Sequence, residues 1–265
     1  MSPIDDLFSK LRNENRKALM PFVTAGDPDL DFTATVIQEL VARGASICEV
    51  GIPYSDPIAD GPVIQASYTR ALERGVKLKD ILAMLGDVAP QVTAPLVTMV
   101  SYAIIFRHGL EQYADALCEN GVAGMIVPDL PVEESPLLAA VCEARDLSLI
   151  QLVTPTTPRE RALKITENSS GFLYYVSVAG ITGERTKLPP ELVDRVSWLR
   201  EQTPLPVCIG FGISQPEHVK LLAPVADGLI VGSAIVRRMA EVGENRDTVL
   251  GEVGDYVGTL LAALP

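Results

Sequence analysis

Residues 45–65, which read ASICEVGIPYSDPIADGPVIQ, contain in one piece the local unit from which the fold can be predicted. The segment Ala45–Ile52 is small or apolar except for Ser46 and Glu49, which predicts a buried strand. The residues that follow are rich in proline, glycine and aspartate and predict a loop. Asp60-Gly61-Pro62 then resembles the start of a helix, where proline is favoured. The stretch is therefore a strand, a loop and the first turn of a helix.

The same unit recurs along the chain. Eight short runs are almost continuously apolar, as expected for parallel strands that are covered on both faces; they are Leu19–Thr24, Ser46–Gly51, Leu96–Val100, Gly124–Val127, Ser148–Val153, Phe172–Val176, Val207–Gly210 and Gly228–Val231. Amphipathic segments between them predict helices at Leu30–Arg43, Leu110–Asn120, Glu133–Arg145, Pro158–Asn168, Leu192–Gln202 and Gln215–Leu222.

Eight such units in 265 residues predict an α/β fold, a closed (β/α)8 TIM barrel, rather than an open sheet. We expect residues 1–265 to form this one domain, with an extra N-terminal helix near Ile4–Arg16 and additional helices at the βα loops. Gly44 and Gly121 mark expected helix ends, because glycine is favoured just after the last turn. In such barrels the reactive groups lie at the C-terminal ends of the strands.

Composition excludes several classes of function. The chain has 22 basic and 34 acidic residues, a formal net charge of −12 and no Lys/Arg cluster, which argues against nucleic acid or an anionic membrane as partner. It contains no apolar run of 18 residues that could span a bilayer and no evident secretory signal, so we expect a cytoplasmic location. The four cysteines are scattered and we expect them to be reduced and near the core, and we expect the two histidines on loops or helix surfaces. This distribution predicts no metal site and no histidine-based triad. The residues are Cys48, Cys118, Cys142, Cys208, His108 and His218.

Three carboxylates within thirteen residues, Glu49, Asp56 and Asp60, are the candidate reactive groups. An ionised Glu49 buried without a partner would cost several kcal/mol, so burial should raise its pKa and leave it suited to acid/base chemistry. Each carboxylate also has a simpler interpretation, because a strand glutamate can be a paired structural group and loop aspartates often cap helices or form turns. Their concentration in one short segment favours an active site.

Glycine-rich loops after the last two strands predict a phosphate site. Gly210–Ser214 and Gly232–Ile235 follow strands seven and eight, where barrels commonly bind phosphate. Glycine lets backbone N–H groups approach an anion, although such turns also occur for packing reasons. The long polar loop Ala179–Thr186 after strand six is expected to be a mobile lid.

Six stretches spread over nearly the whole chain resemble the tryptophan synthase alpha subunit family, and Glu49–Gln65 is the most specific; the others are Pro21–Pro28, Pro128–Glu134, Gly180–Gly183, Gly210–Ser214 and Gly232–Val236. The resemblance implies a carbon–carbon lyase of tryptophan biosynthesis, which cleaves indole-3-glycerol phosphate to indole and glyceraldehyde 3-phosphate by a retro-aldol reaction. It implies no metal and no organic cofactor in this chain.

The resemblance also implies roles for individual residues. Glu49 would be the general acid/base, and Asp60 would accept a hydrogen bond from the indole N–H and stabilise the cationic indolenine. The other implied residues orient these carboxylates (Tyr174, Thr182), line the pocket (Phe22, Phe211) or hold phosphate (Gly183, Gly212, Gly232, Ser233). In one place, Val100–Ile104, the chain departs from the family: an asparagine is missing and Ser101 replaces a pocket tyrosine, which alters the expected indole wall.

The family resemblance implies a partner, a beta subunit that carries pyridoxal phosphate in an αββα heterotetramer, and it places Asp56 and Pro57 in the loop that faces this partner. Alternatives are a stand-alone indole-releasing lyase and a non-catalytic subunit that activates its partner. A further rival is another phosphate-binding barrel, such as a sugar-phosphate isomerase or epimerase; those enzymes usually depend on His, Lys or metal ligands at strand ends, and no such cluster is present.

Overall fold

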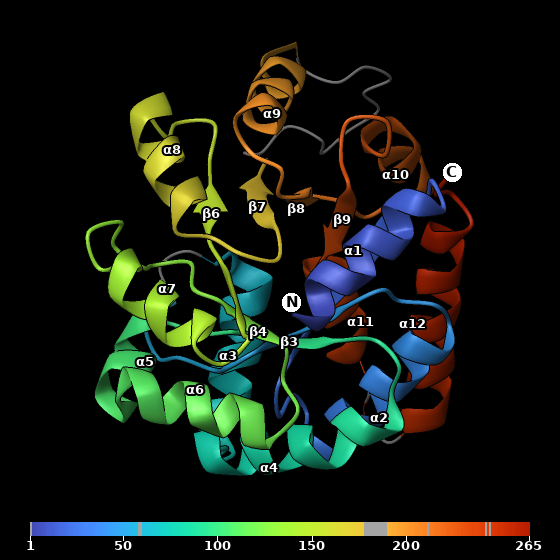
Figure 1. Ribbon diagram of the computed structural model, residues 1–265. Coiled ribbons are helices and arrows are strands. Elements are labelled where there is room, and N and C mark those ends of the chain that lie inside the picture. The colour runs from blue at the N-terminus through green and yellow to red at the C-terminus, as the bar shows by residue number, and fades with distance from the viewer. Residues whose placement is uncertain (1, 58–59, 178–189, 211, 242, 244) are drawn as a thin grey trace.

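The centre of the molecule is a parallel sheet closed into a barrel (Figure 1). The structure is a computed structural model that describes residues 2–265 except 58–59, 178–189, 211, 242 and 244. Its strand segments are β1 (Ala18–Thr24), β2 (Cys48–Gly51), β3 (Leu96–Met99), β4 (Gly124–Ile126), β5 (Ser148–Ile150), β6 (Leu152–Val153), β7 (Leu173–Val176), β8 (Val207–Gly210) and β9 (Gly228–Val231). The pairing order β5-β4-β3-β2-β1-β9-β8-β7-β6 has β5 and β6 at its two ends. Because only Gln151 separates these two segments, they are halves of one strand, and that strand closes the ring. The eight predicted strands are confirmed.

Helices cover the outside of the strands in Figure 1. The described residues contain α1 (Pro3–Asn13), α2 (Leu30–Ala42), α3 (Pro62–Glu73), α4 (Leu78–Val88), α5 (Tyr102–His108), α6 (Leu110–Glu119), α7 (Ser135–Glu143), α8 (Arg159–Glu167), α9 (Pro190–Gln202), α10 (Pro216–Leu222), α11 (Ser233–Met239) and α12 (Arg246–Leu261), with a short 3-10 turn at Ala89–Gln91. Two helices rather than one follow β2, β3 and β9, so α3, α5 and α11 are the additional helices that the sequence predicts at βα loops. The extra N-terminal helix is confirmed as α1. That residues 1–265 form one domain stays a prediction.

Local sequence signals explain where the helices begin and end. The hydroxyl of Ser2 accepts a hydrogen bond from the backbone N–H of Asp5, and the Asp5 carboxylate accepts one from the Ser2 N–H, which is a reciprocal cap at the start of α1. Gly44 and Gly121 have φ angles of 108° and 67°, so glycine ends α2 and α6 in the left-handed region as predicted. The cap residue of α3 is Gly61, without a side-chain hydrogen bond. The simpler interpretation of the preceding aspartate as a helix cap is therefore wrong.

The core has an inner and an outer layer because strand residues alternate between two sides. On β1, Met20 and Phe22 pack inside the barrel, whereas Leu19 and Val23 pack between the strands and the helices. The inner layer also includes Ile4, Phe8 and Leu11 of α1, and the rings of Phe8 and Phe172 lie 5.8 Å apart. Helix α1 therefore closes the N-terminal end of the barrel. The carboxyl ends of the strands remain for a binding site.

Two of the expectations about single residues are wrong. His218 is buried on α10, where its Nδ1 accepts a hydrogen bond from the N–H of Ser214 at 3.2 Å. Cys118 is an exposed residue of α6 rather than part of the core. In the part of the chain that the structure describes, no His, Cys, Asp and Glu side chains are grouped to hold a metal ion. None of the described helices has the length and apolar character needed to cross a bilayer.

Candidate active site

Glu49 lies inside the barrel on β2. The register pairs it with Phe22 of β1 and with Val97 of β3, so neighbouring strands flank it on both sides. Its neighbours Cys48 and Val50 belong to the outer layer, and the alternation of the strand therefore turns Glu49 inward. The side chain is fully buried, and within the described residues neither carboxyl oxygen has a hydrogen-bond partner.

This environment decides the protonation of Glu49. Burial raises the pKa of its carboxyl group well above the ordinary value of 4.5. Buried polar atoms in folded proteins are nearly always hydrogen-bonded, so two unpartnered oxygens on one side chain indicate a ligand or a reacting group as the missing partner. A carboxyl group of this kind can hold a proton near neutral pH and transfer it.

Asp60 lies at the end of the loop between β2 and α3. Its position is fixed by Gln65 of α3, whose side-chain amide donates to the carbonyl oxygens of Asp60 at 2.8 Å and of Pro57 at 3.3 Å. Burial, with a smaller contribution from the negative charge of Asp129, raises the pKa of Asp60 from 3.8 to about 6. The two carboxylates thus differ in kind, because Asp60 ionises at mildly acidic pH while Glu49 resists ionisation.

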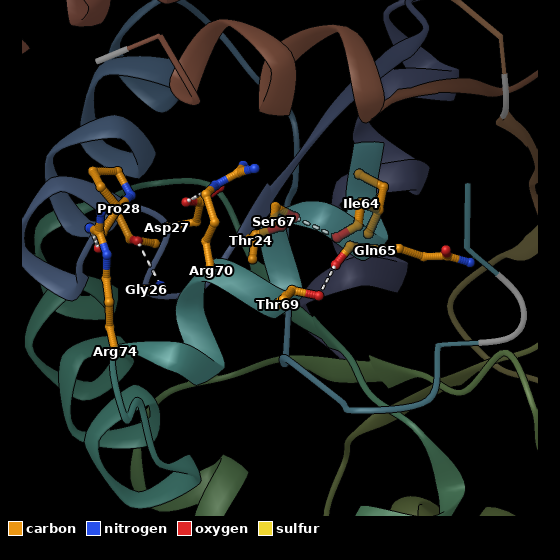
Figure 2. A network of polar contacts seen from close by, with 11 residues as sticks. Thr24, Gly26, Asp27, Pro28, Ile64, Gln65, Ser67, Thr69, Arg70 and Arg74 are labelled. Atoms are coloured by element: carbon orange, nitrogen blue, oxygen red, sulfur yellow. Dashed lines mark hydrogen bonds and ion pairs between the residues drawn. The ribbon is translucent and has the colours of Figure 1, made fainter. Parts of the chain in front are cut away.

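Helix α3 is fastened to the barrel by buried hydroxyl groups, as Figure 2 shows. The Oγ of Ser67 donates to the carbonyl oxygen of Ile64 at 2.7 Å, and it lies 2.6 Å from the Oγ1 of Thr24 at the end of β1. Since Ser67 has one hydroxyl proton, Thr24 is the donor of the second bond. These bonds place Ile64 and Tyr68 of α3 beside the carboxylates.

A cavity of about 250 Å³ joins the two carboxylates. Its described lining residues are Phe22, Glu49, Asp60, Gly61, Pro62, Val63, Ile64, Met99, Tyr174, Gly212, Ile213, Ile230, Gly232, Ser233 and Arg237. Of the predicted site residues, it brings together both carboxylates, the pocket residues Phe22 and Tyr174 and the three glycine-loop residues Gly212, Gly232 and Ser233. Thr182, Gly183 and Phe211 lie outside the described residues, as does the expected lid, Ala179–Thr186.

Asp56 and Pro57 line a smaller recess that meets the cavity at Asp60. Asp56 is exposed and Pro57 is half-buried, so both are accessible on the loop that also carries Asp60. Ser101 and Asp129 also line this recess. The Oγ of Ser101 donates to one carboxylate oxygen of Asp129 at 2.6 Å, and the N–H of Tyr102 donates to the other at 2.7 Å. The small hydroxyl side chain of Ser101 therefore lines the same recess as Asp60.

Two tyrosines surround the carboxylates. The pKa of Tyr174 and that of Tyr68 are both raised well above 10.0, mainly by burial and further by the negative charges of Glu49 and Asp60. Both phenols therefore stay protonated and can donate hydrogen bonds. Tyr68 has no counterpart among the predicted site residues, because an aromatic residue at helical spacing is more often part of a core.

Glycines at strand ends make room for the aromatic rings. A Cβ atom on Gly210 would lie 2.4 Å from the hydroxyl oxygen of Tyr174, and one on Gly51 would lie 2.4 Å from the ring of Phe22. Any larger residue at these two positions would displace an aromatic side chain from the cavity. The sequence contains this signal, since both glycines end predicted strands, but the neighbour that each one accommodates lies on another strand.

Arg237 adds a positive charge to the glycine-rich end of the cavity. It is exposed on α11, one turn after Gly232 and Ser233, and it lines the same cavity. Gly212 has a φ of 78°, a conformation that glycine adopts without strain. Backbone groups at two glycine loops and one guanidinium group form a region suited to an anion. Arg237 was missed because a single arginine on a helix is usually a solvated surface residue.

A closed (β/α)8 barrel with two dissimilar carboxylates at the carboxyl ends of its strands places the molecule in the class of barrel enzymes that bind substrates at this end. Comparison with known proteins gives the family. Residues 8–264 match the family model described as tryptophan synthase alpha chain. The chain belongs to the tryptophan synthase alpha chain family.

Individual relatives agree with this result. The tryptophan synthase alpha chain of Rhodopirellula baltica is 57% identical over 275 residues, which cover 100% of this chain and 99% of the relative. The crystal structure of the tryptophan synthase alpha subunit of Legionella pneumophila str. Paris has a TM-score of 0.91 and 35% identity, with 99% of this chain and 98% of that chain covered. A tryptophan synthase chain of M. tuberculosis, from an aminoacrylate-bound crystal form, has a TM-score of 0.89 and 30% identity, with both chains covered to 100%.

Proposed function

We propose that this chain cleaves indole-3-glycerol phosphate to indole and glyceraldehyde 3-phosphate, as the carbon–carbon lyase component of a tryptophan synthase. The observation that supports this most strongly is Glu49, a fully buried carboxyl group whose two oxygens have no partner among the described residues and which faces a cavity shared with Asp60. A retro-aldol cleavage of this substrate needs one group that gives and takes protons and one that stabilises positive charge. The cavity offers both.

Glu49 performs the proton transfers in this proposal. In its protonated form, which burial favours, it delivers a proton to C3 of the indole ring and creates the cationic indolenine. The resulting carboxylate takes the proton of the hydroxyl group on the adjacent side-chain carbon. The bond between C3 and that carbon then breaks, its electron pair returns to the ring, the hydroxyl carbon becomes the aldehyde, and Glu49 ends protonated as it began.

Asp60 stabilises the charge that forms on the ring. Its carboxylate accepts a hydrogen bond from the indole N–H, and its negative charge offsets the positive charge of the indolenine. The raised pKa of about 6 leaves Asp60 ionised at neutral pH but reduces its charge in mild acid. Tyr174 and Thr182 orient the two carboxylates, and Phe22 and Phe211 contact the indole ring.

The substrate phosphate binds at the glycine-rich end of the site. Gly183, Gly212, Gly232 and Ser233 offer backbone N–H groups and a hydroxyl group, and Arg237 offers a charged donor. In this proposal the phosphate binds at the rim of the barrel and the indole ring binds inside it, next to Glu49.

The partner in this proposal is a tryptophan synthase beta subunit, which carries pyridoxal phosphate in an αββα complex, and no cofactor binds in this chain. Asp56 and Pro57 contact the beta subunit. Support comes from their accessibility on the loop that carries Asp60 and from their position in a recess shared with it. A cytoplasmic location stays a prediction.

The test is a product analysis with the purified chain. Given indole-3-glycerol phosphate, the chain alone should release indole and glyceraldehyde 3-phosphate in equal amounts, and addition of a beta subunit should accelerate the release. Full activity without any response to a beta subunit would favour a stand-alone lyase. Absence of both products, alone and with the partner, would favour a non-catalytic activating subunit and contradict the proposal.

A further inference from the structure

A second cavity, of about 380 Å³, lies outside the substrate site and is lined by three arginines. It is formed by the loop after β1, the end of α3, the end of α11 and the start of α12, and its lining includes Asp27, Pro28, Arg70, Arg74, Met239 and Arg246. None of its described lining residues belongs to the substrate cavity. A concave space of this size is in the range of small-molecule sites.

Arg70 is held in place by a buried partner. Its Nε and Nη2 donate to the two carboxylate oxygens of Asp27 at 2.9 and 2.6 Å, a bidentate pair. The side chain of Asp27 is 3% exposed, whereas that of Arg70 is 36% exposed. The carboxylate thus fixes the guanidinium plane from the protein side, and the remaining edge of Arg70 is accessible from the cavity.

The other two arginines have different partners, a backbone carbonyl for Arg74 and a partly exposed carboxylate for Arg246. Figure 2 shows Arg70 and Arg74 projecting from α3 toward Asp27 and Pro28, and an Nη1–H of Arg74 donates to the carbonyl oxygen of Pro28. Arg246 donates through both Nη atoms to the carboxylate of Asp29, one bond measuring 3.3 Å. Although burial alone would raise the pKa of Asp29, the N–H of Phe32 and the charges of Arg246 and Arg74 outweigh it, and the pKa is lowered.

The charge of this cluster is opposite to that of the whole chain. Three guanidinium groups face the two carboxylates of Asp27 and Asp29, which leaves one net positive charge in a protein with a formal net charge of −12. Each guanidinium has five N–H donors, and the bonds described above use one or two of them. Donors from three guanidinium groups on two helices, with surplus positive charge, match a phosphate group better than a carboxylate. A phosphate group has three acceptor oxygens and about −1.5 to −2 charge, whereas a carboxylate has two oxygens.

We propose that this cavity is a second anion site, which binds the phosphate group of a small phosphorylated metabolite through Arg70, Arg74 and Arg246. The site is separate from the phosphate region of the substrate cavity. It lies at the far ends of α3 and α11, the two helices whose first residues line the substrate cavity.

The test is an NMR titration of the full chain with inorganic phosphate as the probe, followed at the amide of Gly243, a lining residue, and at the Nε–H of Arg74. We expect saturable shifts at both positions. Glycerol 3-phosphate should produce the same shifts, and a dicarboxylate such as succinate should bind more weakly. This order of affinities distinguishes a phosphate site from a general anion site.

Variants assign the effect to the cavity. Arg74→Gln removes one charged donor without leaving a buried carboxylate unpaired, and it should weaken phosphate binding at Gly243 by roughly ten- to a hundredfold. Arg246→Gln should also weaken phosphate binding, and it replaces Arg74→Gln in the test if that variant fails to fold. Arg43→Gln is the matched control, because Arg43 pairs with Glu39 and Asp255 outside the cavity and its loss changes the net charge equally. Unchanged titration in both cavity variants, or no saturable shift in the parent, would overturn the proposal and leave the arginines as structural ion pairs.

Discussion

Replacing Glu49 by glutamine should change the pH dependence of stability in a defined way. In the folded protein burial raises the pKa of Glu49 well above 4.5, so above pH 4.5 the folded state keeps a proton that the unfolded chain has lost. The stability contributed by this protonated carboxyl is fully present below the unfolded pKa and is lost as the pH rises toward the folded pKa. Linkage then requires the free energy of unfolding of the parent to fall by about 1.4 kcal/mol per pH unit relative to Glu49→Gln, because the two states differ by one bound proton.

The pH range over which this slope holds lies above pH 4.5, because Glu49 is completely buried and neither of its oxygens has a hydrogen-bond partner among the described residues. A glutamine of nearly the same shape cannot ionise, so the free energy of unfolding of the variant should rise relative to that of the parent as the pH increases above 4.5. Below pH 4.5 this difference in free energy should not change. The gain should level off above the folded pKa.

The assay is denaturant unfolding of both proteins at half-unit steps from about pH 4 to pH 8, with the difference in free energy plotted against pH. Glu217→Gln, which removes an exposed glutamate of α10, controls for the loss of one negative charge from an acidic chain. A difference that does not change with pH would refute the reasoning, since it would mean that Glu49 ionises in the folded protein as readily as in the unfolded chain.

Three further predictions concern the rest of the site. Asp129→Asn should move the acidic limb of the pH profile of kcat/KM to lower pH by less than about one unit, because burial is the larger of the two causes that raise the pKa of Asp60 from 3.8 to about 6. The substrate phosphate titrates identically in both proteins, so an acidic limb at the same pH in both would contradict this prediction. Gly232→Asp should fold, because a Cβ atom at this position would lie 3.5 Å from Phe22, in ordinary contact. It should raise KM for indole-3-glycerol phosphate by charge repulsion, and Gly232→Asn should raise KM less. Equal KM values for the two variants would show that the phosphate binds elsewhere. Asp56→Ala should weaken activation by a beta subunit and spare cleavage by the isolated chain. Calorimetric titration with a beta subunit, with and without a substrate analogue, measures the coupling between substrate and partner, which is ~1–3 kcal/mol for effects of this kind. Loss of cleavage by the isolated variant would assign the loop to the pocket.

The barrel could be predicted from the sequence because its strands are buried on both faces and read as apolar runs. The predicted strand Ser148–Val153 appears as β5 and β6, interrupted at Gln151, whose side chain is hydrogen-bonded to Ser135 and Asn168 of the outer layer. The hydrophobic pattern of the sequence does not reveal this break, because Gln151 is hydrogen-bonded to groups that are distant in the chain. Additional helices at βα loops were predicted, but the position of the one at Tyr102–His108 was not, because its sequence YAIIFRH is largely apolar and resembles a continuation of the preceding strand.

The site was predicted as far as its chemistry is local in the sequence. Glu49 and Asp60 belong to one short segment, so their types and spacing were visible without the fold. Met99 and Ile230 reach the cavity only through the register of distant strands, and as apolar strand residues they are indistinguishable from core. The same reason explains the error at His218, which is buried by packing between helices that no local pattern specifies.

The most direct test of the central claim, that Glu49 is the proton-transfer group of a retro-aldol lyase, is the rate of indole release by Glu49→Gln. Both proteins should be compared at saturating indole-3-glycerol phosphate, after circular dichroism has shown that the variant is folded. Because general acid/base groups contribute about 10²–10⁴-fold, the variant should lose at least two orders of magnitude in kcat. A rate within threefold of the parent would show that Glu49 is a structural residue and that another group carries the chemistry.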